Sequence, residues 1–262
     1  MPSVIDQMGR EVIFQSTKRI VSLVPSQTEL LIDLGLREQI VGITKYCIHP
    51  PELRQELNII GGTKDLDIDK IRALNPDIII ANKEENQQDQ IETLSKEFPV
   101  WISDINKFEE AWEMIRAIGH IFQKEKLSDL MVQKGQEKWA KLASPRIQAS
   151  CLYFIWQKPY MLAGENTFIN AVLKHIGIHN LAEQLESRYP EISLEKIKGL
   201  NPDYIFLSSE PYPFKEKNKN QMEGFGLEGS VHLVDGEYFS WYGSRLVHAA
   251  DYFEELKSKL HL

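Results

Sequence analysis

The chain has little of what marks several protein classes. Its 262 residues include two cysteines, Cys47 and Cys151, which are far apart and form no CxxC pair, so a disulfide framework or a zinc site of paired cysteines is not expected. No apolar run approaches the roughly 18 residues of a membrane helix. Positive charge is also in deficit, with a net charge of −8, which disfavours broad binding to nucleic acid or to anionic membranes.

Catalytic and targeting motifs are scarce as well. The first residues, MPSVIDQMGREV, show no basic segment followed by an apolar run, so no signal peptide is predicted. The Walker A, GxSxG and HExxH patterns are absent, and the GxGxxG match at Gly224–Gly229 precedes a strand instead of opening a helix. What remains is an ordinary globular composition, 42% hydrophobic and 26% charged, long enough for one large domain or two.

An internal repeat organises the chain. Residues 69–80 read DKIRALNPDIII, and residues 195–206, close to half the chain length further on, read EKIKGLNPDYIF. Each copy predicts a short helix that ends at Asn-Pro, because the residue before proline disfavours the α conformation, and then a buried strand. The predicted helices and strands are Asp69–Leu74, Asp77–Ala81, Glu195–Leu200 and Asp203–Leu207. The repeat therefore predicts two halves with similar secondary structure.

Other short apolar runs predict further strands. They are Arg19–Val24, Gln39–Ile43, Asn58–Ile60, Val100–Ile102, Cys151–Trp156 and Val231–Val234. Ser26 and Glu29 form the pattern of a capping box for a helix that runs to Leu34, and Asn166 is the expected N-cap of a helix that ends at Ile176. Strands that alternate with helices indicate βαβ units and a parallel sheet in each half.

A long helical stretch separates the halves. Apolar residues between Phe108 and Phe122 follow the 3.6-residue period, and Gln123–Ala143 continues the helical pattern up to Ser144-Pro145. The predicted fold class is therefore α/β, with two Rossmann-like lobes that contain parallel sheets and are joined by a single long α-helix. The predicted division is an N-terminal lobe at 1–122, a linker helix at 123–144 and a C-terminal lobe at 145–262.

Several segments together resemble a known family. They are the opening DxxGREV, RIVSLVPSQTELLIDLGL, IGGTKDLDIDKIRALNPDIIIA, the helical bridge and the second LNPD strand. This combination is similar to the class III substrate-binding proteins of ABC importers, the cobalamin and ferric-siderophore type with a helical backbone. The resemblance implies two lobes that clamp a small-molecule metal complex, a permease partner, and a monomer in the periplasm or on the cell surface. The missing signal pattern leaves a cytoplasmic location open.

The resemblance also implies that acidic residues dock each lobe onto the permease. The position that aligns with the family's first-lobe glutamate is Gln88 here, which departs from the pattern. The nearby candidates are Glu84 and Glu85, and the second-lobe candidates are Glu210 and Glu216 in SSEPYPFKEK.

The candidate ligand-binding residues follow predicted strands, because ligands of open α/β sheets gather beyond the carboxyl ends of the strands. They are Ser26, Tyr46, His49, Trp156, Tyr160, Trp241, Tyr242 and Arg245. The aromatic faces suit a large planar ligand, and Arg245, near a helix start, could bind a carboxylate or phosphate. His49 is the one candidate metal ligand, in a Cys-x-His loop. In the alternative interpretation, Trp241 packs in the core and Arg245 pairs with a surface acid.

These observations favour a non-enzymatic solute-binding protein that captures a cobalamin-like corrinoid or a ferric siderophore in the cleft between the lobes. No intrinsic cofactor is expected. Two alternatives stay open. One is a cytosolic carrier of a tetrapyrrole or metal complex without a signal. The other is a chelatase-like enzyme, for which His49 with Glu237 is the only pairing that the sequence offers.

Overall fold

The computed structural model describes residues 2–262, which form two compact units. The first unit comprises the chain up to Ile105 with Glu109–Lys134 and Tyr242–Val247; the second comprises Asn106–Phe108, Gly135–Trp241 and His248–Leu262. The predicted connector is present as helix α6 (Glu125–Leu142), and the division between the units falls within it, after Lys134. Each unit is an α/β structure, as the alternating pattern predicts.

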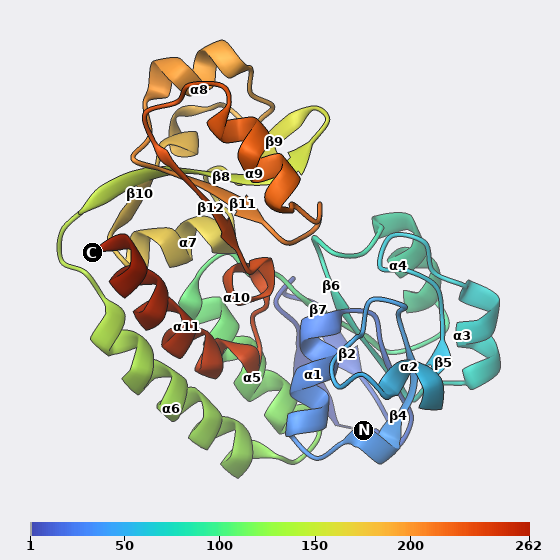
Figure 1. The fold of residues 1–262 in the computed structure, drawn as a ribbon. Coiled ribbons are helices and arrows are strands. Elements are labelled where there is room, and N and C mark those ends of the chain that lie inside the picture. The colour runs from blue at the N-terminus through green and yellow to red at the C-terminus, as the bar shows by residue number, and fades with distance from the viewer. Residues whose placement is uncertain (1) are drawn as a thin grey trace. The chain divides into compact units, whose positions relative to one another are not determined.

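The first unit is built on a five-stranded parallel sheet (Figure 1). Its spatial order is β5 (Asn58–Ile59), β4 (Ile40–Ile43), β3 (Ile20–Ser22), β6 (Ile78–Asn82) and β7 (Val100–Ser103). The chain adds strands on one side of β3 and then crosses to the other side with β6. This reversal of strand order is a topological switch point, where ligands of open α/β sheets bind. A hairpin of β1 (Ser3–Ile5) and β2 (Glu11–Ile13) precedes the sheet.

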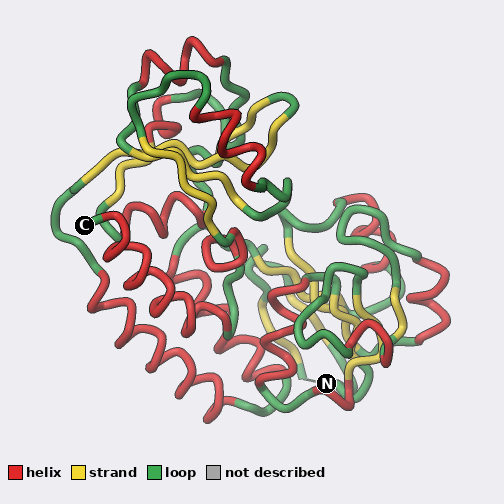
Figure 2. Tube along the Cα trace, in the orientation of Figure 1, coloured by secondary structure: helices red, strands yellow, loops and turns green. Residues whose placement is uncertain are grey.

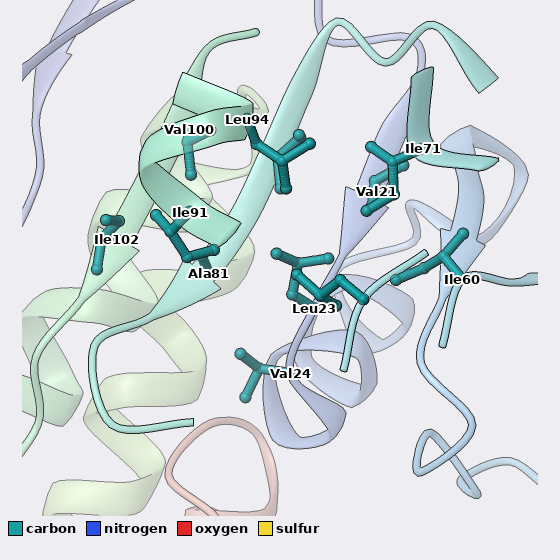
Figure 3. Packing of buried hydrophobic residues seen from close by; sticks show 12 residues of the cluster. Val21, Leu23, Val24, Ile60, Ile71, Ala81, Ile91, Leu94, Val100 and Ile102 are labelled. Atoms are coloured by element: carbon teal, nitrogen blue, oxygen red, sulfur yellow. The ribbon is translucent and has the colours of Figure 1, made fainter. Parts of the chain in front are cut away.

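Helices cover this sheet and bury its apolar residues. They are α1 (Pro25–Asp33), α2 (Leu53–Glu56), α3 (Ile68–Leu74), α4 (Gln88–Ser95) and α5 (Phe108–Ile121), of which Phe108 belongs to the second unit. Figure 3 shows Ile91 of α4 beside Ala81 of the sheet, and Leu94 of the same helix belongs to the same buried cluster. All five residues of β6 are buried, as expected for a central strand that is covered on both faces.

The second unit is built on a five-stranded sheet as well, in which four strands are parallel and lie side by side in Figure 2. The order is β10 (Ile178–Asn180), β8 (Ala149–Gln157), β11 (Tyr204–Ser208) and β12 (Ser230–Val234), and β9 (Tyr160–Leu162) pairs antiparallel with β8. Its helices are α7 (Phe168–His175), α8 (Leu194–Leu200), α9 (Glu216–Glu223), α10 (Gly236–Ser240) and α11 (Arg245–Leu260), of which Arg245–Val247 belongs to the first unit.

The sequence repeat corresponds to two nearly identical helix ends. Asp67 and Ser193 are the N-caps of α3 and α8, and each side chain accepts a hydrogen bond from the backbone N–H three residues on. Asn75 and Asn201 end the two helices in the left-handed conformation, with φ of 44° and 46°. Asparagine tolerates this conformation better than most residues, and the following proline prevents the helix from continuing. The predicted helix stop is therefore confirmed.

The aspartate of each LNPD copy accepts hydrogen bonds from residues at or just before the start of the neighbouring strand. Asp77 accepts hydrogen bonds from Ser16 Oγ at 2.7 Å and from the backbone N–H of Lys18 at 2.9 Å. Asp203 accepts from both the hydroxyl and the backbone N–H of Ser150 at 2.7 Å. The Ser150 hydroxyl is the main cause of a lowered pKa at Asp203, and the backbone bond is the next.

Asp203→Asn is expected to make stability less sensitive to acid. Because the folded-state pKa of Asp203 is lowered, its contribution is fully present above the ordinary carboxyl range and is lost as the pH falls through the lowered value. Urea unfolding at neutral and at acidic pH should therefore show a smaller loss on acidification in the variant than in the wild type. Asp33→Asn, on α1, is the matched control, and equal losses in wild type and Asp203→Asn would contradict the assignment.

Two predicted helix caps are wrong. Helix α1 begins at Pro25 after Val24, with no side-chain cap, so Ser26 lies inside the first turn instead of capping it. Proline suits that position because its missing N–H would have no intrahelical partner there. The N-cap of α7 is Thr167, one residue after the predicted Asn166, and Asn166 takes a positive φ of 59° in the preceding turn.

Candidate functional site

The carboxyl ends of β6 and β7 in the first unit are held by buried side-chain amides. Asn82 donates to Ser103 Oγ at 3.0 Å, and its carbonyl oxygen accepts from the backbone N–H groups of Glu84 and Glu85 at 2.8 and 2.9 Å. Asn86 donates to the carbonyl of Thr63 at 3.1 Å. These bonds fix the loop that carries both predicted docking glutamates. Burial, with the Glu84 charge second, raises the pKa of Glu85.

Tyr46 is an exposed aromatic at the carboxyl end of β4. Its side chain is 51% exposed and lies with Lys45 over the backbone of Gly62. A Cβ at Gly62 would come within 3.2 Å of both side chains, so the glycine leaves room for them. The Lys45 ammonium is 5.2 Å from the centre of the Tyr46 ring, within cation–π range. The unit thus presents one face of a tyrosine at the sheet edge where ligands are expected.

The Cys-x-His loop does not form a closed metal site in this structure. Cys47 is buried, with its sulfur 3.1 Å from Thr28 Oγ1, and burial raises the pKa of the thiol, which disfavours the thiolate form that binds metals. His49 is half-buried. Within residues 2–262, no three His, Cys, Asp or Glu side chains are grouped to hold a metal ion. The role of His49 as a metal ligand stays a prediction.

Arg245 already binds a carboxylate. Its Nε and Nη2 donate to the two carboxylate oxygens of Glu29 at 2.9 and 2.7 Å, and both side chains are largely buried. The guanidinium fork, a predicted site for a ligand anion, is therefore paired inside the first unit. The alternative interpretation expected a surface acid as its partner, whereas Glu29 is largely buried. Ser26, three residues before Glu29, and Tyr242, three residues before Arg245, are buried as well. Their side chains are 5% and 6% exposed. These three predicted residues lie together in the packed interior of the unit.

Trp241 is also mainly a packing residue. It is 8% exposed, and its Nε1 donates to Glu210 Oε1 at 3.0 Å, where Ser240 Oγ donates at 2.6 Å. Glu210 therefore ties the end of α10 to the loop after β11 and is only half-exposed. Glu216, the other predicted docking residue of this unit, is exposed at the start of α9.

Unlike Trp241, Trp156 is exposed, and it is the only exposed one of the five tryptophans within residues 2–262. It is 40% exposed at the end of β8, whereas the other four are at most 8% exposed. Tyr160, on the following strand, is half-buried and packs edge-on against Phe154 at 5.6 Å between ring centres. Sequence reasoning missed Tyr212, whose ring lies 5.6 Å from that of Trp156. Its position in a Pro-rich loop gave no signal of this contact.

The first unit also has two surface cavities that involve none of the predicted ligand residues. One, of about 280 Å³, is lined by Met8, Arg10, Ile91, Ile102 and neighbours that include Gln88. The other, of about 230 Å³, lies between the N-terminal hairpin and the end of α5. As for membrane spans, no helix within residues 2–262 combines the length and the apolar character that crossing a bilayer requires.

The fold defines a protein of two α/β units, each with a largely parallel sheet, and comparison with known proteins gives its family. Residues 20–226 match the model of the periplasmic binding protein family, and the chain belongs to that family. The resemblance seen in the sequence is therefore confirmed. The chain is an ABC-type substrate-binding protein.

The similarity to several known proteins extends over nearly the whole chain. The ABC transporter substrate-binding lipoprotein YvrC of Bacillus subtilis is 26% identical over 272 residues, which cover 97% of this chain and 85% of that protein. The vitamin B12 binding protein of Vibrio cholerae is 23% identical in structure comparison, with a TM-score of 0.78 and coverage of 90% and 94%. The heme-binding protein RhuT from Roseiflexus has 18% identity, a TM-score of 0.78 and coverage of 91% and 97%. The two structures confirm the predicted fold.

Proposed function

We propose that this protein captures a metal complex, a cobalamin-like corrinoid or a ferric siderophore, and delivers it to an ABC importer permease. The observation that carries the proposal is the exposed indole of Trp156 at the carboxyl end of β8. A large apolar side chain costs free energy when it faces water, and aromatic faces at a sheet edge are suited to stacking on planar ligands. Exposed Tyr46 at the end of β4 supports the same assignment.

The relatives support the ligand class by analogy. Among the structures with the same fold, one is named for vitamin B12 and one for heme, and both compounds are metal-bearing macrocycles with wide, flat faces. Each unit offers one exposed aromatic residue for such a face. In the second unit it is Trp156, with Tyr160 near it in sequence, and in the first unit it is Tyr46, with His49 near it. Arg245, Trp241, Tyr242 and Ser26 would act indirectly, through packing.

Docking to the permease would then rest on acidic residues. Glu216 is exposed, whereas Glu84 and Glu85, on the fixed loop after β6, are half-buried. Glu210 is a weaker candidate because its carboxylate already accepts two internal hydrogen bonds. A protein that delivers its ligand to such a permease would be located in the periplasm or on the cell surface. His49 and Glu237, which the chelatase alternative would need together, belong to different units, and that alternative stays a hypothesis.

Trp156→Ala is expected to weaken binding of cyanocobalamin or hemin about tenfold, which corresponds to about 1.4 kcal/mol. The loss is that of one aromatic stacking contact and the area it buries. Isothermal titration calorimetry of wild type and variant measures it. Leu127→Ala removes a similarly exposed apolar side chain from α6 and should leave the affinity unchanged. Equal affinities of Trp156→Ala and wild type would contradict the role of Trp156.

A further inference from the structure

The exposed indole of Trp156 is supported by a neighbouring tyrosine. Tyr212 lies on the loop after β11, and its ring meets that of Trp156 edge-on, with 5.6 Å between ring centres and 70° between planes. The backbone N–H of Tyr212 donates to the carbonyl of Ile155, the residue before Trp156, at 3.2 Å. The loop is thus hydrogen-bonded to β8 next to the residue that carries the indole.

Tyr212 is itself held from several sides. Its hydroxyl donates to Gln157 Oε1 at 2.6 Å, and the same oxygen accepts from Asn218 Nδ2 of α9 at 2.9 Å. The Gln157 amide nitrogen donates to Gln221 Oε1 at 3.1 Å. The ring also packs against Phe214, at 4.7 Å between ring centres. Contacts from α9, from β8 and from its own loop therefore fix the tyrosine ring.

We propose that Tyr212 is a positioning residue, which holds the indole of Trp156 in one orientation so that it offers a ready-made face to a flat, conjugated ligand. The inference rests on the proposed function for its ligand and on the contacts of Tyr212 for its mechanism. An indole that is already ordered loses less conformational freedom on binding than one that rotates about two side-chain torsions. Tyr212 thus acts on affinity through Trp156, without being required to touch the ligand.

A double-mutant cycle tests this dependence. Calorimetric titration with hemin and with cyanocobalamin compares wild type, Tyr212→Leu, Trp156→Ala and the double variant. Tyr212→Leu is expected to weaken binding three- to tenfold, and the double variant should bind no more weakly than Trp156→Ala alone, because the tyrosine has no effect once the indole is gone. Tyr212→Phe, which keeps the ring, should lose less. Tyr238→Leu, which removes a tyrosine that stacks on Tyr252, is the control and should not change affinity. Additive losses would overturn the proposal.

A ligand-free measurement separates this proposal from the proposed function. With 5-fluorotryptophan incorporated, the ¹⁹F resonance of Trp156 is assigned by its absence in Trp156→Phe. In Tyr212→Leu this resonance should shift towards that of free fluorotryptophan, while the four buried tryptophans keep theirs. An unchanged resonance overturns the positioning role even if ligands bind. A shifted resonance with no binding of either probe supports the positioning role and counts against the proposed ligand class.

Discussion

Phe239→Ala is expected to lower the free energy of unfolding by about 3–5 kcal/mol, the usual range for deleting a buried phenylalanine. Phe239 lies on α10 and is fully buried. Its ring centre is 4.8 Å from that of Tyr153 and 4.7 Å from that of Phe253. Truncation would leave a cavity that these large neighbours cannot fill without moving. The sequence places Phe239 in the same aromatic stretch as Trp241 and Tyr242, yet its position makes it a residue of the core.

Urea unfolding followed by circular dichroism measures this effect. The matched control is Trp156→Ala, which removes a larger aromatic side chain that is 40% exposed and should therefore cost less than about 1–2 kcal/mol. The two variants thus separate stability from binding. Phe239→Ala should unfold at a lower urea concentration, whereas Trp156→Ala should stay stable but bind the ligand weakly. A stable Phe239→Ala together with an unstable Trp156→Ala would contradict the assignment of the two aromatics.

Gly61→Ala is expected to destabilise the protein by about 2–4 kcal/mol, because the glycine has a conformation and surroundings that exclude a side chain. Its φ is 98°, and an added Cβ would come within 2.3 Å of the Asp65 carbonyl oxygen and 3.0 Å of the Asp67 nitrogen. Both neighbours are backbone atoms, so they cannot move aside by rotating a side chain. The turn continues into Gly62, whose backbone the Tyr46 ring packs against. Because a distorted turn would move Tyr46, ligand affinity should fall as well.

The control for this substitution is Gly199→Ala in α8. Gly199 is exposed, and no atom lies within 4 Å of the position that a Cβ would take there, so alanine should be neutral or stabilise by up to about 1 kcal/mol through its helix propensity. Urea midpoints of both variants give the comparison. If Gly61→Ala were as stable as wild type, the backbone conformation described for this turn would be wrong.

The features predicted from sequence are those that depend on local pattern. The LNPD segments gave both helix stops and the two central strands β6 and β11, because proline and an apolar run act over a few residues. The alternation of elements gave the two parallel sheets. Strands β9 and β10 were not predicted.

The site was only partly predictable, because its decisive contacts join distant residues. Arg245 pairs with Glu29, 216 positions away, and Trp241 with Glu210, 31 positions away, so both candidates are occupied within their own units. Tyr212 reaches Gln157 across 55 positions. Composition and spacing could identify Trp156 as a candidate aromatic, but its exposure depends on which side of β8 the sheet leaves uncovered.

Exposed aromatic side chains are the proposed means by which this protein binds its metal complex. The most direct measurement is a titration of the folded wild-type protein with cyanocobalamin, dicyanocobinamide, hemin and several ferric siderophores, followed by tryptophan fluorescence and by heat. At least one of them is expected to bind with a Kd well below about 100 μM and to quench tryptophan fluorescence. Binding of none more tightly than about 100 μM, or roughly −5.5 kcal/mol, would contradict the proposed function.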